Sequence, residues 1–383
     1  MADNNKNKVL NVPHLRFPEF TGEWQCKAIE KVAPLQRGFD LPTQNLVEGI
    51  YPVIYSNGIL QHHDKYKCEA PGLITGRSGT IGKFTYIDSG FYWPHNTSLW
   101  VTDFCGNCPK FIYYLYQTVH IEQFSTGSGV PTLNRNDVHR YKTSIPTAIV
   151  EQEKIAKFLS ILDERIVTQN KIIEKYESLI QAIIYQKKTD GMRVKSWQKT
   201  ELSKVLQERN EKNIDGYVVC SVSVSQGVVN QMEYLGRSFA AKETTHYNVV
   251  KYGDIIYTKS PTGDFPYGIV KRSCIKKSVA VSPLYGVYKP ICDSIGVILH
   301  FYFMQPSNAF NYLHPLIQKG AKNTINITNE RFLKNSIPLP KAENEAIYIA
   351  NTLISIQKKI DMEKKMLRSY EKEKQYLLSK MFI

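Results

Sequence analysis

The most regular hydrophobic pattern of the chain lies between Glu151 and Lys188. Its apolar positions recur at alternating steps of four and three residues, which is typical of the seam of a coiled-coil helix. Acidic residues open the segment and lysines close it, as the helix dipole favours, and Asp190-Gly191 is expected to stop the helix. The seam comprises Ile155, Leu159, Leu162, Ile166, Gln169, Ile173, Tyr176, Ile180 and Ile183.

The same pattern returns near the C-terminus, 194 residues further along the chain. A polar residue again stands at the fifth position and a tyrosine at the seventh, which indicates a duplicated helix. Antiparallel pairing of the two copies would bring Ile155 near Leu377 and would place Gln169 opposite Glu363, where a polar pair fixes the register. The second seam comprises Ile349, Leu353, Ile356, Ile360, Glu363, Leu367, Tyr370, Lys374 and Leu377.

Two shorter repeats frame each half of the chain. Trp24-Gln25 recurs as Trp197-Gln198, and a Ser-Ile-Pro triplet before the first long helix, ending at Pro146, recurs with its end at Pro338. Between these marks lie runs of β-branched and aromatic residues separated by Gly, Pro and Asn, which predict strand-rich domains. The two inserts differ in sequence. We predict an α+β protein with internal pseudo-two-fold duplication: a domain over 1–150, a helix over 151–188, a domain over 189–342 and a helix over 343–383.

Charge is unevenly distributed along the 383 residues. The chain carries 49 basic and 35 acidic side chains, a net charge of +14, and residues 189–342 hold 20 of the basic and 11 of the acidic ones. A basic excess of this kind favours a polyanionic partner. No apolar run reaches the roughly 18 residues of a membrane span, no signal-peptide pattern opens the chain, and the seven cysteines are scattered. We therefore expect a cytoplasmic protein with reduced thiols.

No arrangement of residues predicts catalysis. Cys105 and Cys108 have the spacing of zinc ligands, but no second pair accompanies them, so no metal site is predicted. The glycine-rich run Phe124 to Pro131 resembles a methyltransferase loop, yet Pro131 prevents a helix from starting where that loop requires one. Neither a Ser/His/Asp triad nor a pair of carboxylates can be identified.

The run GRSGTIGK at Gly76 to Lys83 is the first candidate for binding. Its spacing is one residue too long for a nucleotide phosphate loop, and a phenylalanine follows its lysine. It is either a plain turn between strands or a loop whose amides and side chains contact DNA phosphates and bases, and we favour the second interpretation. The candidate DNA contacts are Arg77, Ser78, Thr80 and Lys83 in this run, His62, His63 and Lys65 in a predicted loop, and Lys259, Ser260, Thr262, Lys271, Arg272, Lys276 and Lys277 in the second insert.

The motifs together resemble one known family. The run VPHLRFPEFTGEW spans Val12 to Trp24, GSGVPTLN spans Gly127 to Asn134, and SIPTAIVEQEKIAKFL spans Ser144 to Leu159. With the duplicated helix, these motifs are similar to the specificity (S) subunit of type I restriction-modification systems over the whole chain. The second copy departs from the pattern, because Glu-Gln-Glu becomes Glu-Asn-Glu at 343–345.

The resemblance implies a non-catalytic subunit with two target recognition domains, each reading one half of a split DNA sequence. It also implies docking of two methyltransferase (modification) subunits and two restriction (translocase and nuclease) subunits. S-adenosylmethionine, ATP and Mg would be used by those partners and not by this chain. A helix of about 38 residues, ~57 Å at ~1.5 Å per residue, would act as a ruler between half-sites.

Two alternatives from other classes stay open. One is a DNA-modifying enzyme acting alone, which would modify DNA as a purified chain. The other is a coiled-coil scaffold protein without sequence-specific DNA binding, which would bind no duplex even with a methyltransferase present.

Overall fold

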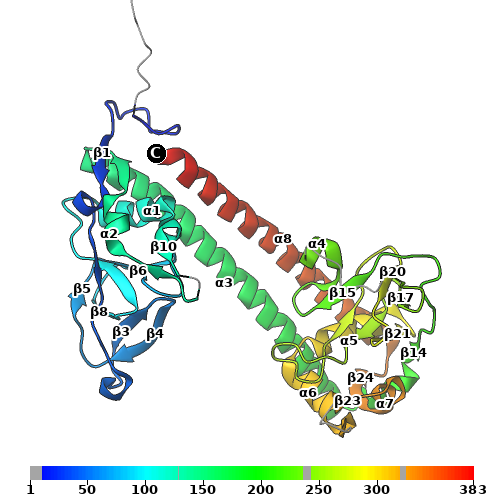
Figure 1. Cartoon of the computed structure of the whole chain (residues 1–383). Helices are drawn as coiled ribbons and strands as arrows, with labels where there is room; N and C mark the ends of the chain where they lie inside the picture. The colour runs from blue at the N-terminus through cyan, green and yellow to red at the C-terminus, as the bar shows by residue number, and fades with distance from the viewer. Residues whose placement is uncertain (1–10, 128, 236–242, 320–324) are drawn as a thin grey trace, which may run out of the picture. The chain divides into compact units, whose positions relative to one another are not determined.

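The computed structural model describes residues 11–127, 129–235, 243–319 and 325–383. The chain divides into two compact units, unit 1 with residues 1–169 and 366–383 and unit 2 with residues 170–365. Two long helices, α3 (Ile149–Arg193) and α8 (Glu343–Met381), each have one part in each unit. Figure 1 shows the elements of both units with their labels.

Unit 1 contains two four-stranded sheets, ordered β2-β9-β6-β7 and β4-β3-β8-β5. The pair β1-β12 joins the two ends of the insert, and β10-β11 forms a small hairpin. The strands are β1 (Gln25–Ala28), β2 (Leu35–Arg37), β3 (Tyr51–Tyr55), β4 (Gly58–His63), β5 (Cys68–Glu69), β6 (Gly72–Gly76), β7 (Phe84–Ile87), β8 (Phe91–Pro94), β9 (Ser98–Val101), β10 (Ser125–Thr126), β11 (Thr132–Leu133) and β12 (Lys142–Ile145); the helices are α1 (Pro109–Val119) and α2 (Arg135–Arg140).

Unit 2 contains a four-stranded sheet ordered β14-β21-β18-β19 and four two-stranded pairs: β13-β24, β15-β16, β17-β20 and β22-β23. The strands are β13 (Trp197–Glu201), β14 (Leu206–Glu208), β15 (Cys220–Ser223), β16 (Gly227–Asn230), β17 (Asn248–Val250), β18 (Ile255–Tyr257), β19 (Val270–Arg272), β20 (Val279–Val281), β21 (Gly286–Pro290), β22 (Gln318–Lys319), β23 (Ile325–Asn326) and β24 (Ser336–Pro340). The helices are α4 (Gln231–Leu235), α5 (Asp293–Phe303), α6 (Pro306–Leu313) and α7 (Asn329–Lys334).

The two units share one topology although their insert sequences differ. Strand order β14-β21-β18-β19 repeats β2-β9-β6-β7, and β13-β24 repeats β1-β12. In the second sheet of unit 1, β3 pairs with β4 antiparallel and with β8 parallel. Unit 2 repeats this pattern: β15 pairs with β16 antiparallel, and Val219, next to β15, forms a parallel bridge with Ala280 in β20. The internal duplication therefore includes the inserts. Helix α6 has no helical counterpart between α1 and β10, where unit 1 has the 3-10 turn Ile121–Phe124.

The core of unit 1 surrounds α1, whose residues Phe111, Tyr114 and Tyr116 are fully buried. Pro109 occupies the first turn, where a missing amide hydrogen costs nothing, and His120 ends the helix in the left-handed region. The buried Tyr116 hydroxyl donates to the Ala33 carbonyl at 2.5 Å. Phe111 stacks on Phe382 at a centroid distance of 5.3 Å, which joins the helix to the end of α8.

Helix α3 extends beyond the predicted stop at Asp190-Gly191, so that prediction was wrong. The helix runs to Arg193, the Val194 amide donates to the Asp190 carbonyl at 2.9 Å, and Lys195 ends it with a φ of 61°. Gly191 has a packing role instead, because a Cβ there would lie 2.0 Å from Cδ1 of the Trp197 ring. The apolar segment near Ile298 to Leu316 is divided among α5, α6 and a 3-10 turn.

Within each unit the parts of α3 and α8 run antiparallel. In unit 1, Ile155 shares a cluster with Leu378 and Met381, and further along α3 Asp163 pairs with Lys374 at 2.7 Å. In unit 2, Glu177 pairs with Lys364 at 2.7 Å, and Lys187 lies 5.8 Å from the Tyr348 ring centroid. Residue numbers rise along α3 as they fall along α8, as the antiparallel prediction requires.

The seam positions are all buried or half-buried. The buried ones are Ile155, Leu159, Leu162, Gln169, Ile173 and Ile180 on α3, and Ile349, Leu353, Ile356 and Ile360 on α8. The half-buried ones are Ile166, Tyr176, Ile183, Glu363, Leu367, Tyr370, Lys374 and Leu377. Near the end of α3 the buried stripe moves by one residue, from Ile183 to Ile184, because a straight helix drifts relative to a seven-residue repeat. The pairing of Gln169 with Glu363 stays a prediction.

Candidate nucleic-acid interface

The run GRSGTIGK forms the connection between β6 and β7 of unit 1. Gly76 ends β6 at a position where a Cβ would lie 1.7 Å from the Thr80 carbonyl oxygen, so the loop folds back on its own backbone. Gly79 and Gly82 have φ angles of 78° and 82°, which glycine adopts without strain. Thr80 and Lys83 are exposed, while Arg77 and Ser78 are half-buried. The loop is a turn between strands that leaves polar side chains at the surface.

A second glycine-rich motif lies directly against this loop. Ser78 forms an antiparallel bridge with Thr132, the Gly79 amide donates to the Pro131 carbonyl at 3.0 Å, and the Leu133 amide donates to the Arg77 carbonyl at 2.8 Å. Residues 77–83 and the β10-β11 hairpin thus form one surface, which we call the loop pair of unit 1. Val130 is 68% exposed in it.

The corresponding connection in unit 2 runs from Thr258 to Ile269, between β18 and β19. It carries three of the predicted contacts: Lys259 is half-buried, and Ser260 and Thr262 are exposed. Lys259 has a φ of 59°. A Cβ on Gly268 would lie 2.9 Å from the amide nitrogen of Lys259. Burial lowers the pKa of Lys259, partly opposed by Glu208. The repeat therefore places two separately predicted groups, around Arg77 and around Lys259, at equivalent positions.

Lys271 and Arg272 were predicted as phosphate contacts, but both are buried in β19, at 4% and 6% exposure. Arg272 pairs with Asp293, and its amide donates to Nδ1 of His300 at 3.1 Å. Burial and these two cations lower the pKa of His300 to about 3, so the ring accepts as a neutral imidazole. A buried side chain presents no charge to a phosphate, and we withdraw Lys271 and Arg272 from the candidate surface.

Replacing Lys271 by Met is expected to stabilise unit 2 at neutral pH. Burial lowers the pKa of Lys271 to about 8, so folding at pH 7 carries the cost of a buried ammonium group. The unfolded chain binds more protons between the folded and the unfolded pKa, so native stability rises with pH over that window. We expect a gain on the order of 2 kcal/mol at pH 7, shrinking above pH 8, measured by urea unfolding. A gain in unfolding free energy that did not change with pH would contradict the interpretation that it comes from removal of the buried ammonium charge.

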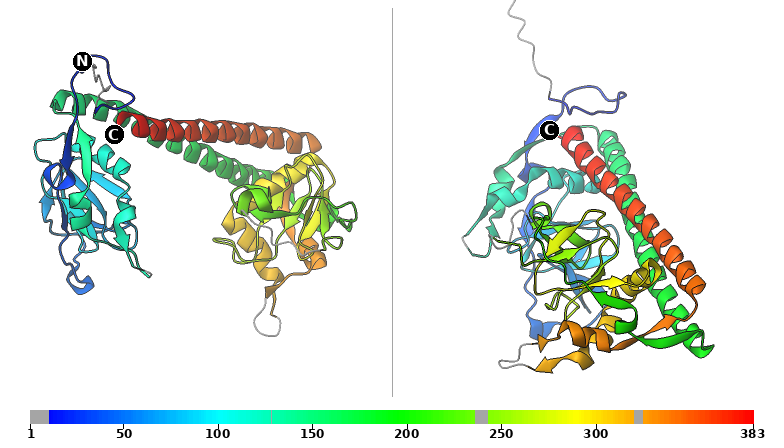
Figure 2. Two further views of the ribbon diagram at one scale, coloured as in Figure 1. Left: turned by 45° about the horizontal axis from the view of Figure 1, so that its top comes forward. Right: turned by 90° about the vertical axis from the view of Figure 1, so that its right-hand side faces the viewer.

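The helix starts show how the repeated scaffold holds each unit. The indole Nε1 of Trp24 donates to Glu151 at 3.1 Å, and that of Trp197 donates to Glu345 at 2.8 Å. These pairs occupy equivalent positions of the duplication. In unit 1 alone, Arg16 adds an ion pair to Glu151 at 2.7 Å, and the Leu15 amide donates to the Lys380 carbonyl at 2.8 Å, so the N-terminal segment lies at the end of α8 (Figure 2).

Comparison with known proteins gives the family of this fold. Residues 21–178 match the family described as "Type I restriction modification DNA specificity domain". This part of the chain, residues 21–178, is therefore similar to a type I DNA specificity domain. The S subunit of a type I restriction-modification system from M. genitalium is similar in structure, with 15% identity, a TM-score of 0.65, and coverage of 97% of this chain and 99% of that one. The HsdS subunit from Thermoanaerobacter tengcongensis is 14% identical, with a TM-score of 0.39 over 94% of this chain and 96% of that one.

The remaining predicted contacts lie apart from the two loops. His62 and His63 belong to β4 of unit 1 and not to a loop. His62 is exposed, whereas His63 is 4% exposed and its ring Nδ1 lies 3.0 Å from the Val47 carbonyl oxygen. Lys65 is exposed after this strand. Lys276 and Lys277 are exposed between β19 and β20, at the end of β19 opposite to the Lys259 loop.

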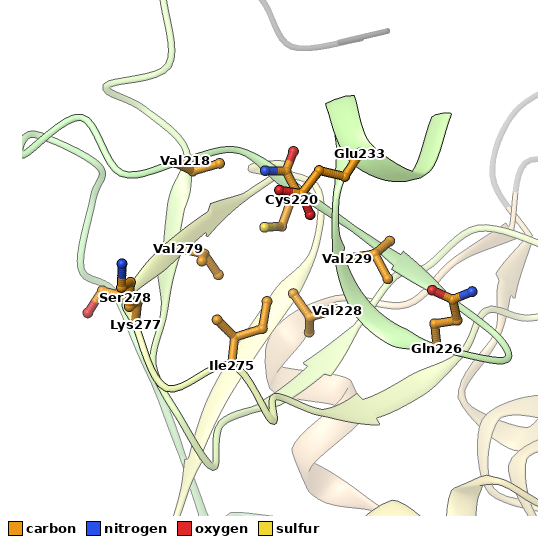
Figure 3. Close-up of a pocket in the computed structure, with 11 residues that line it drawn as sticks. Val218, Cys220, Gln226, Val228, Val229, Glu233, Ile275, Lys277, Ser278 and Val279 are labelled. Atoms are coloured by element: carbon orange, nitrogen blue, oxygen red, sulfur yellow. The ribbon is translucent and has the colours of Figure 1, made fainter. Parts of the chain in front are cut away.

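The second sheets of the two units carry different side chains. Unit 2 has a hollow of about 660 Å³ with Cys220, Val228 and Val279 on its walls and Lys277 at its side (Figure 3). On the equivalent strands of unit 1 lie the Tyr51 and Phe91 rings. The centroid of the Tyr66 ring is 5.0 Å from that of Tyr51 and 4.3 Å from that of Phe91. Different side chains on equivalent strands are expected of domains that face different ligands.

The residues that the structure describes include no group of three or more His, Cys, Asp and Glu side chains arranged to hold a metal ion. Over the same residues, no helix combines the length and the apolar character needed to cross a membrane.

Proposed function

We propose that this chain is the specificity subunit of a type I restriction-modification complex and recognises a bipartite DNA target. The observation that carries the proposal is the specificity-domain topology present twice in one chain. In this proposal the loop pair of unit 1 contacts one half of the target and the Thr258–Ile269 loop contacts the other. In this proposal exposed Lys83, Lys276 and Lys277 and half-buried Lys259 supply phosphate contacts, and exposed His62 and Lys65 are further candidate contacts of unit 1.

The proposal includes partners that perform the chemistry. Two modification subunits and two restriction subunits would dock on this chain, and the repeated helix starts at Glu151 and Glu345 support two similar docking surfaces. S-adenosylmethionine, ATP and Mg would bind to those subunits. An enzyme acting alone, or a scaffold protein without DNA specificity, is the competing function.

Exchanging one insert is expected to change one half of the methylated sequence and to leave the other half unchanged. The exchange should replace residues 29–141 by the insert of another specificity subunit, because the flanking β1-β12 pair then keeps its register from Gln25 to Ala28. Methylome sequencing of a host that carries the chimaera and the modification subunit reads both halves.

The matched experiment exchanges residues 202–335, which lie inside the β13-β24 pair. A chimaera that altered both halves, or neither, would defeat the modular function. Methylation by the purified chain alone would favour the solitary enzyme, and absence of duplex binding by the assembled complex would favour the scaffold protein.

A further inference from the structure

Three rings meet beside the Thr258–Ile269 loop of unit 2. The Phe310 and His314 rings stack with a centroid distance of 5.1 Å and an interplanar angle of 14°. Tyr267, which belongs to the loop, lies 5.3 Å from Phe310 and 5.8 Å from His314. We call Tyr267, Phe310 and His314 the aromatic stack.

Two of the three rings of the aromatic stack are exposed, and the third, Tyr267, is half-buried. Phe310 is 40% exposed and His314 is exposed, whereas Ala309, Tyr312 and Leu313 of the same short segment are buried in the core. The buried residues hold α6 in place, so the core does not require a ring at position 310. An exposed aromatic cluster of this kind indicates contact with a ligand.

The position of the aromatic stack connects it with recognition. Tyr267 lies in the connection that corresponds to residues 77–83 of unit 1, and the buried Tyr257 hydroxyl holds it by donating to the Tyr267 carbonyl at 2.8 Å. Half-buried Lys259 lies in the same loop. Helix α6, which presents Phe310, lies where unit 1 has only the turn Ile121–Phe124. Unit 2 thus places rings beside its loop in a segment where unit 1 has no α-helix.

We propose that the aromatic stack makes an apolar contact with a DNA base in the half-site read by unit 2. This inference rests on the proposed function and names a specificity-determining element within it. Aromatic side chains contact base faces and thymine methyl groups, and such contacts carry no charge. The aromatic stack therefore contributes affinity and base preference, whereas Lys259 contributes through phosphate.

The test compares Phe310→Ala with Lys259→Ala in the complex assembled with modification subunits. Phe310→Ala weakens binding to the cognate duplex about tenfold and leaves the slope of log affinity against log salt unchanged. Lys259→Ala weakens binding and flattens that slope by roughly 0.9, because one phosphate contact is lost. Methylome sequencing of the Phe310→Ala complex shows relaxed preference in the second half of the target and an unchanged first half.

Asn311→Ala is the matched control, since Asn311 is an exposed neighbour on α6 outside the aromatic stack. It binds and methylates as the native complex does, and thermal unfolding of both α6 variants matches that of the native chain. Native affinity and native sequence preference in Phe310→Ala would overturn the inference while leaving the proposed function intact. Loss of subunit assembly with retained DNA binding would overturn it in favour of a protein contact. A native complex that methylates no DNA would overturn the proposed function itself.

Discussion

Replacing Glu151 by Ala is expected to lower the free energy of unfolding of unit 1 by about 4 kcal/mol. The Glu151 side chain is 3% exposed and accepts from Arg16 Nε at 2.7 Å, Arg16 Nη2 at 2.8 Å and Trp24 Nε1 at 3.1 Å. Its removal leaves a guanidinium that is only 15% exposed without its carboxylate and a buried indole without its acceptor. Hydrogen exchange of the β1 and α1 amides, compared between variant and native chain, measures the loss.

Glu345→Ala provides the matched control within the same chain. Glu345 accepts from Trp197 Nε1 at 2.8 Å, and among the described residues no basic side chain pairs with it within salt-bridge distance. Only one neutral donor loses its partner, so a loss of about 1 kcal/mol is expected in unit 2. Equal losses at the two positions would show that the Arg16 ion pair contributes nothing beyond the indole hydrogen bond.

The long helices and their antiparallel pairing could be predicted from the sequence because a seam repeats over many turns. The error at Asp190-Gly191 has a local cause: glycine there serves the Trp197 ring and not the helix end. The shared topology of the inserts could not be predicted, since strand order depends on contacts between distant residues whose identities have diverged.

The candidate interface was predictable in parts only. Each glycine-rich run of unit 1 could be recognised in the sequence by itself. The bridge between Ser78 and Thr132 that joins them is a tertiary contact, which the sequence does not reveal. Burial of Lys271 opposes the usual exposure of lysine, so charge counting misassigned it. The aromatic stack was missed, although Phe310 and His314 are four residues apart, a spacing that places side chains together on one face of a helix.

Deleting one heptad from each long helix is expected to shorten the unread spacer of the DNA target and to preserve both half-sequences. Seven residues correspond to ~10 Å of helix at ~1.5 Å per residue, or about three base pairs at ~3.4 Å each. Residues 170–176 and 360–366 suit the deletion, because the antiparallel contacts Glu177 to Lys364 and Lys187 to Tyr348 place these segments opposite each other within the register. Removal of a whole heptad keeps the seam in phase.

Deletion from α3 alone is the control for this experiment. It removes the α3 residues that face one heptad of α8, so apolar seam residues such as Ile360 lose their cover, and we expect reduced stability instead of a shorter, well-defined spacer. Methylome sequencing measures the spacer for both variants. If the complex with the double deletion methylates targets that keep the original spacer, the helices do not set the distance between half-sites. If it methylates targets whose spacer is about three base pairs shorter, α3 and α8 act as the ruler, because the rest of both units is unchanged.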